Sequence, residues 1–228
     1  MEVDFIPMRN LWFANYNAAN VSMIYWENNT LAVNKVSGST GFVIVGTDPG
    51  GIAVTPNGQY VYVANQGSAT VSVISTSTNS VVSTISGLSG PYGVAITPNG
   101  QYVYVANNGG TVSVISTSTN SVVSTIPVGS SPDGVAVTPN GQYVYVANYG
   151  SNTVSVISTS TNSVVSTISV GGNPTSVAIT PNGQYVYVTS NGGSVSVIST
   201  STNQVVATIT GTPANPYGIN YGPLGSAC

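Results

Sequence analysis

Few side chains in this sequence could transfer protons or bind metal ions. The 228 residues include five acidic residues, two basic residues and no histidine, so the formal net charge is −3. Acid–base catalysis uses His, Asp, Glu and Lys in pairs, and zinc, iron and copper sites use His and Cys. We therefore predict no catalytic, cofactor-binding or metal-binding residues, and no enzyme. The charged residues are Glu2, Asp4, Arg9, Glu27, Lys35, Asp48 and Asp133.

The charge and hydropathy patterns exclude two classes of partner. Two basic residues cannot neutralise the phosphates of a nucleic acid, so no nucleic-acid partner is predicted. No run of about 18 apolar residues would span a bilayer, and residues 1–17 do not read as a signal peptide. We expect any export signal to have been removed or to lie outside this sequence. Cys228 is the single cysteine, so it is either free or available for a link between chains.

The remaining side chains of interest are tyrosines, one aspartate and two asparagines. Asp133 lies in Ser-Pro-Asp-Gly, which is typical of a turn. Asn20 and Asn28 each begin an Asn-X-Ser/Thr triplet, so both are candidate N-glycosylation sites. Pairs of tyrosines recur along the chain and could stack on sugars. We favour a packing role between neighbouring sheets, with each hydroxyl bonded to a polar group. These tyrosines are Tyr60, Tyr62, Tyr102, Tyr104, Tyr143, Tyr145, Tyr185 and Tyr187.

The tyrosine pairs belong to a repeat that must position them. The segment TPNGQYVYVAN begins at Thr55, Thr97 and Thr138, and TPNGQYVYVTS begins at Thr180, so the period is 41 or 42 residues. This period without a helical pattern indicates an array whose unit is one small sheet.

Each repeat unit reads as four strands separated by turns. β-Branched and aromatic residues favour strands, and Pro98-Asn99-Gly100 suits a tight turn between the first two. The Ser-Thr-Ser-Thr-Asn segment bonds its own backbone and suits a second turn. In the second full copy the predicted strands are 93–97, 101–107, 111–116 and 121–126.

The central strands are apolar on both faces, so each sheet needs a neighbour on either side. Radial packing of blades supplies those neighbours, and we predict an all-β fold: a β-propeller of four-stranded antiparallel blades. A parallel β-solenoid is the competing architecture, but it would not need an Asn-Gly hairpin in every repeat.

The ends of the chain set the predicted blade count at five. The segments LWFAN, NVSMIYW and GFVIVG match the second, third and fourth strands of a degenerate first blade that lacks its first strand. NPYGINYG near the C-terminus matches that missing strand and could close the ring within one chain or between chains. About eight extra residues around Glu27 to Thr40 form either a contact surface or a tolerated loop. The prediction is a single domain over 1–228, with a first blade at about 8–46, regular repeats at about 50–210 and a closing strand at about 215–222.

The repeats closely resemble the YVTN-repeat family of β-propellers, best known from surface-layer and other cell-surface proteins of archaea and bacteria. TVSVISTSTNSVVSTI and GSSPDGVAVTPNGQYVYVANYGSNT carry the resemblance, which covers Gly50 to Gly218 and, more weakly, Leu11 to Gly46. The family usually closes with seven blades. The resemblance therefore implies either an unusual five-bladed form or a piece of a longer chain.

The repeats differ from that family at positions that commonly carry charge. Neutral residues occupy these positions in every regular repeat. Acid usually unfolds proteins by protonating paired carboxylates, and this chain has few carboxylates, so we expect it to tolerate acid. The neutral residues are Ser75, Ser116, Ser158, Ser199, Asn57, Asn99, Asn140, Asn182, Gln59, Gln101, Gln142 and Gln184.

Taken with the resemblance, these features predict a structural, extracellular cell-surface protein. An uncharged surface favours self-association, so the expected partners are copies of the chain in a surface layer or filament. The alternative is a propeller module that binds a glycan or a protein through one face or through the central channel. An enzyme such as the lactonase-like propellers is a distant third possibility.

Overall fold

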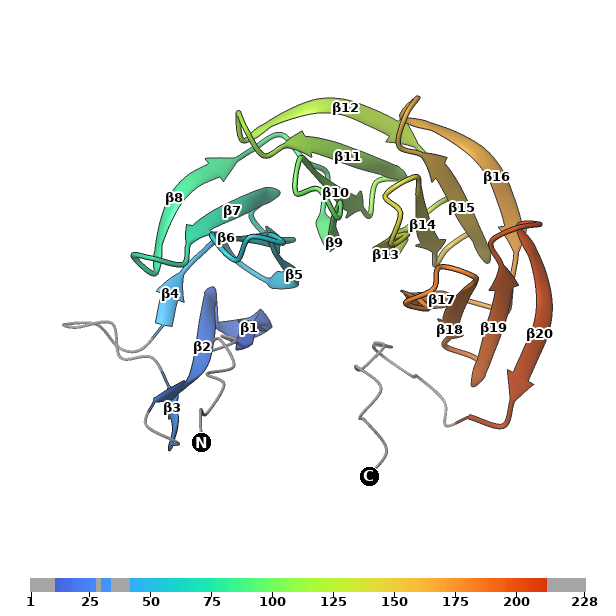
Figure 1. Ribbon diagram of the computed structural model, residues 1–228, viewed down its shortest axis with the longest axis horizontal. Helices are drawn as coiled ribbons and strands as arrows, with labels where there is room; N and C mark the ends of the chain where they lie inside the picture. The colour runs from blue at the N-terminus through green and yellow to red at the C-terminus, as the bar shows by residue number, and fades with distance from the viewer. Residues whose placement is uncertain (1–10, 28–29, 34–41, 213–228) are drawn as a thin grey trace, which may run out of the picture.

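The described part of the protein is an all-β array of five four-stranded antiparallel sheets. A computed structural model describes residues 11–27, 30–33 and 42–212. Within these residues the sheets follow one another along an arc around a common axis (Figure 1). This arrangement confirms the predicted propeller architecture of four-stranded blades. Among the described residues no helix is long and apolar enough to cross a membrane.

The four regular sheets share one topology, with each strand bonded to the next strand in the chain. Their first strands face the axis and their fourth strands form the outer rim (Figure 1). The second sheet has β5 (Pro49–Val54), β6 (Tyr60–Asn65), β7 (Thr70–Ser75) and β8 (Ser80–Ile85). The third has β9 (Pro91–Ile96), β10 (Tyr102–Asn107), β11 (Thr111–Ser116) and β12 (Ser121–Pro127). The fourth has β13 (Pro132–Val137), β14 (Tyr143–Asn148), β15 (Thr153–Ser158) and β16 (Ser163–Ser169), and the fifth has β17 (Pro174–Ile179), β18 (Tyr185–Ser190), β19 (Ser194–Ser199) and β20 (Gln204–Thr210).

The turn between the first two strands of each regular sheet is closed by its own side chains. In the third sheet, the Thr97 hydroxyl donates to Asn99 Oδ1 at 2.7 Å, and Asn99 Oδ1 also accepts the backbone N–H of Gln101 at 3.0 Å. Gly100 has φ of +70°, a conformation that glycine adopts without steric cost. The sequence Thr-Pro-Asn-Gly-Gln therefore fixes the hairpin register that carries the paired tyrosines.

Neighbouring sheets are joined by a buried tyrosine and an asparagine. Tyr62, Tyr104 and Tyr145 are almost fully buried between sheets, as predicted. Tyr104 Oη donates to Asn162 Oδ1 at 2.9 Å, and Tyr62 and Tyr145 bond Asn120 and Asn203 in the same way at 2.6 Å. Burial, followed by the neighbouring tyrosine of each pair, raises the pKa of these three phenols to about 12. Each therefore remains a neutral donor over the physiological range.

The tyrosines lie within continuous apolar layers between the blades. Tyr62 and Val73 of the second sheet pack with Val103 and Ile115 of the third, and the same arrangement recurs at the next two interfaces. The first tyrosine of each pair is different. Tyr60, Tyr102, Tyr143 and Tyr185 are partly exposed, so the prediction of a packing role between sheets holds for the second tyrosine rather than for the first.

The first sheet departs from the regular pattern. It contains β1 (Leu11–Asn15), β2 (Asn20–Glu27), β3 (Thr30–Val33) and β4 (Phe42–Ile44), with a short 3-10 turn, η1 (Tyr16–Ala18), after β1. The long strand β2 pairs with β4 over its first half and with β3 over its second half. The extra residues were predicted as a loop, but the described part of them extends β2 into a hairpin instead. The predicted closing strand at 215–222 lies outside the described residues.

Candidate functional site

The two faces of the array carry different turns. On one face, the turn between the third and fourth strands meets the turn between the first two, where Thr76 Oγ1 donates to the carbonyl of Gly58 at 2.8 Å. On the other face, the link that enters each sheet meets the turn after its second strand, where the Gln66 N–H donates to the carbonyl of Asp48 at 2.9 Å. We call these the constant face and the variable face, because their sequences differ in how far they vary between repeats.

Repeats that are otherwise almost identical diverge on the variable face. The Thr-Pro-Asn-Gly-Gln and Ser-Thr-Ser-Thr-Asn turns of the constant face recur unchanged in all four regular repeats. Two positions on the variable face change in chemistry from repeat to repeat. The second residue of each inner strand is Gly50, Tyr92, Asp133 or Thr175, and the residue after each second strand is Gln66, Asn108, Tyr149 or Asn191.

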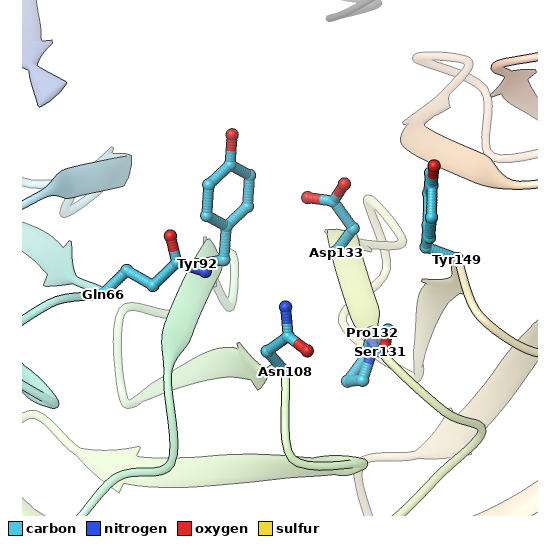
Figure 2. A pocket seen from close by; sticks show the side chains of 7 residues that line it. All are labelled: Gln66, Tyr92, Asn108, Ser131, Pro132, Asp133 and Tyr149. Carbon is cyan, nitrogen blue, oxygen red and sulfur yellow. The ribbon is translucent and has the colours of Figure 1, made fainter.

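All of these divergent residues except Asn191 line a pocket at the axis. It has two adjoining hollows of about 330 and 410 Å³, and Tyr92 and Asp133 line both of them. In Figure 2 the side chains of Tyr92, Asp133 and Tyr149 point to the same side, with the carboxylate between the two rings. Gln66 and Asn108 add amide groups to the first hollow, and Tyr16 of η1 lies at the second.

Glycines allow the inner strands to approach closely around this pocket. A Cβ atom on Gly93 would collide with the backbone carbonyl oxygen of Asp133 in the next inner strand. A Cβ atom on Gly51 would collide in the same way with the carbonyl of Tyr92. The third residue of the inner strand is therefore small, so that the second residues of successive blades lie near one another.

The interpretation of Asp133 as a turn residue is wrong. It is the second residue of strand β13, because Pro132 begins the strand and Gly134 packs against β17 instead of turning the chain. Burial raises the pKa of the Asp133 carboxyl to about 6. Among the described residues no hydrogen bond or ion pair reaches this carboxylate.

Of the remaining candidate residues, Asn20 is described and does not line the pocket. Asn20 is the first residue of β2, where its Nδ2 donates to the carbonyl of Ala18 at 3.0 Å and its Oδ1 accepts from Asn15 at 2.7 Å. Asn28 and Cys228 lie outside the described residues. N-glycosylation at Asn20 or Asn28 remains a prediction that intact mass would check.

Sequence reasoning missed Tyr92, Tyr149, Gln66 and Asn108. Each looks like an ordinary turn or strand residue within its own repeat. A comparison of the repeats with one another would have singled them out, because they differ where the surrounding sequence does not.

The donor groups of the pocket do not suit a metal ion. Within residues 11–27, 30–33 and 42–212, no three His, Cys, Asp or Glu side chains gather closely enough to hold one. Metal sites in proteins draw on several carboxylate, imidazole or thiolate groups, whereas this pocket offers one carboxylate with amides and phenols. What the pocket can do is bind a small ligand through aromatic faces, amide groups and one negative charge.

Two solved structures illustrate the similarity of the fold. A chain of hydrazine synthase from Kuenenia stuttgartiensis matches with a TM-score of 0.68 and 28% identity over 77% of this chain and 52% of its own length. The present chain thus spans about half of that one. A protein of unknown function from Desulfotomaculum acetoxidans DSM 771 matches with a TM-score of 0.75 and 18% identity over 87% of this chain and 66% of its own. This second likeness concerns the fold alone.

Sequence comparison supports the predicted resemblance in part, because the family that matches is a propeller family. No curated protein matches the chain in sequence. The YVTN-repeat type of surface-layer propeller is not confirmed. The sequence model of the SMP-30/gluconolactonase/LRE-like region matches residues 45–192, which make up about two thirds of the chain and span the described regular sheets up to β18. The chain belongs to the SMP-30/gluconolactonase/LRE-like family.

Proposed function

We propose that this propeller is a non-enzymatic binding module that holds a small ligand in the axial pocket of the variable face. One observation carries the proposal. Gly50, Tyr92, Asp133 and Thr175 occupy one equivalent position in near-identical repeats, and all four line the pocket. Packing alone gives no reason for this divergence, since the same strands are otherwise alike. Ligand binding does give a reason, because a ligand at the axis would contact a different side chain from each blade.

Ligand-observed NMR with a panel of small polar compounds, including neutral sugars, would test this function. The expected result is saturation transfer to at least one compound, lost in Tyr92→Ala because an aromatic wall is removed from both hollows. Tyr102→Ala is the matched control, because Tyr102 is a partly exposed tyrosine of β10 that does not line the pocket. Equal loss in both variants, or transfer that neither variant changes, would refute an axial site.

Self-association is a second candidate function, favoured by exposed apolar residues on the face of the fifth sheet that points away from the fourth sheet. Ile209 is 49% exposed, whereas the equivalent Ile126 is 2% exposed because the next sheet covers it. At the opposite end of the arc Phe13, Phe42 and Ile44 are also exposed. A second copy that covers these two surfaces would extend the array head to tail, as in a surface layer or filament outside the cell.

Sedimentation velocity over a range of concentrations would test this association. Ile209→Ser is expected to weaken it, because the substitution places a polar group in the proposed contact. Val206→Ser is the control, since Val206 is exposed like Val82, Val123 and Val165 in the other sheets. A monomer at all concentrations would exclude the filament.

Lactone hydrolysis, the chemistry in the family's description, is not proposed for this chain. Ester hydrolysis at neutral pH uses a metal-bound water, or a base and an acid that act together. The described lining of the pocket has one carboxylate, and the chain has no histidine to work with it. A gluconolactone assay with added Mg²⁺, Ca²⁺ or Zn²⁺ is expected to give the buffer rate, and any acceleration lost in Asp133→Asn would overturn this assignment.

A further inference from the structure

Within the described part of the chain, the Asp133 carboxylate is a negative charge without a counter-charge. The chain has no histidine, and its basic residues, Arg9 and Lys35, both lie outside the described residues. No donor from the described part of the chain bonds the carboxylate. Desolvating an ionised carboxylate without a partner costs free energy. Burial raises its pKa to about 6, which still leaves it mostly ionised at pH 7.

Aromatic rings stand beside this charge. Tyr92 of β9 and Tyr149, which follows β14, flank the carboxylate in the first hollow (Figure 2). The face of a tyrosine ring carries partial negative charge and attracts a cation within about 6 Å. The other polar groups of this hollow, on Gln66, Asn108 and Ser131, carry no charge. The described pocket lining therefore carries one negative charge and no positive charge that would balance it.

We propose that the ligand of the axial pocket is a small organic cation, whose ammonium group is held by the Asp133 carboxylate beside the rings of Tyr92 and Tyr149. The inference rests on the proposed binding function and names the ligand class of that same site. Volumes of about 330 and 410 Å³ suit a small molecule. A cation compensates the half-buried charge of Asp133, which a neutral sugar would leave uncompensated.

Calorimetric titration with choline and with its uncharged isostere 3,3-dimethylbutan-1-ol separates charge from shape. Choline is expected to bind at least about tenfold more tightly than the neutral alcohol, because only choline carries the charge that pairs with Asp133. Propylammonium serves as a second probe for a primary amine. Asp133→Asn keeps the shape of the pocket and is expected to lower the affinity for the cations by about tenfold or more, with little effect on the alcohol. Asp48→Asn, the same substitution outside the pocket lining, is expected to bind as the unmodified protein does.

The pH dependence provides an independent readout. Among the described residues, the titratable groups that line the pocket with Asp133 are Tyr92 from β9, Tyr149 after β14 and Tyr16 of η1. Strand β17 contributes Thr175 and Ser176, which do not titrate. Protonation of Asp133 therefore governs the binding of choline. The affinity of the unmodified protein for choline is expected to fall by about tenfold from pH 7 to pH 5, whereas the affinity of the Asp133→Asn variant is expected to stay constant.

The outcomes distinguish this inference from the function on which it rests. Equal affinity for choline and the alcohol, or full affinity for choline in Asp133→Asn, would overturn the proposal that the ligand is a cation. If neither choline nor propylammonium binds but a neutral sugar does, and Tyr92→Ala abolishes that binding, the pocket is a binding site of another class. If no compound shows binding that depends on Tyr92, both proposals fail.

Discussion

At the scale of single residues, one hydrogen bond recurs wherever two regular sheets meet. Tyr104 of β10 donates to Asn162, which lies in the next sheet with φ of +49°. The first interface lacks this bond because the first sheet has Trp12 where the others have tyrosine. Both Trp12 Nε1 and Asn79 Oδ1 are buried without a partner among the described residues. The first and second sheets are therefore joined by apolar packing around Val21, Val61 and Ile74.

This difference predicts unequal effects of the same substitution. Asn162→Gly removes the acceptor of the Tyr104 hydroxyl and is expected to cost about 1–3 kcal/mol of unfolding free energy, because a buried donor loses its partner. Asn79→Gly is expected to cost much less, since no tyrosine donates to Asn79. Both positions have φ near +50°, which glycine accepts, so the backbone contribution is matched. Chemical denaturation of the two variants checks the prediction, and equal losses would contradict it.

At the scale of strands, the inner strands β5, β9, β13 and β17 combine close packing with variety. Their third residues are Gly51, Gly93 and Gly134 in the second to fourth sheets, where a Cβ atom would strike the next inner strand. Their second residues line the pocket. In each of these three strands, the third residue must therefore be small, whereas the residue before it can vary.

Gly93→Ala is expected to destabilise the protein by about 1–3 kcal/mol, because β9 and β13 would have to move apart. For a chain of this size that corresponds to a fall of roughly 2–12 °C in melting temperature. Gly172→Ala, at a glycine with no atom within 4 Å of its added Cβ, is the control and is expected to melt within about 1 °C of the unmodified protein. Equal melting temperatures for the two variants would show that β9 and β13 accommodate a Cβ atom at position 93 without a steric clash.

Most of the strands could be predicted from sequence because their causes are local. Alternating Tyr and Val residues and the Thr-Pro-Asn-Gly-Gln turn determine β6, β10, β14 and β18 within a few residues of chain. The pocket has no such local cause. Tyr92 and Asp133 are 41 residues apart in sequence and approach only because successive sheets share an axis. The β2–β3 hairpin escaped prediction for another reason, since no second copy of that segment exists for comparison.

At the scale of the whole molecule, the scarcity of charge shapes the response to acid. Asp133 has a folded-state pKa of about 6, above its ordinary value of 3.8, so the folded protein binds this proton more tightly than the unfolded chain. Its contribution to stability therefore increases as the pH falls through 6 and levels off near 4. This direction is opposite to that of a salt-bridged carboxylate, whose protonation favours unfolding.

Thermal melts between pH 7 and pH 4 are expected to show a higher melting temperature at pH 4. Asp133→Asn should raise the melting temperature at pH 7 and remove its dependence on pH in this range, because the amide cannot ionise. Asp48→Asn is expected to retain the increase on acidification. If the melting temperatures of the unmodified protein and both variants all fall on acidification, groups other than Asp133 determine the response to pH.

Acid tolerance extends the same measurement to lower pH. The expected melting temperature at pH 2 lies within about 15 °C of that at pH 7, because few carboxylates are present to be protonated. A larger fall would count heavily against the predicted acid tolerance.

The Tyr–Asn bond and the apolar layer around it also bear on how such a chain can evolve. Since each regular sheet meets the next through the same contacts, duplication or deletion of one unit of 41 or 42 residues in the gene creates no junction that is new to the protein. The array can therefore lengthen or shorten by whole units without a compensating substitution elsewhere. Each inserted unit would also bring a further inner-strand side chain to the axis, so that unit number and side-chain chemistry can change separately.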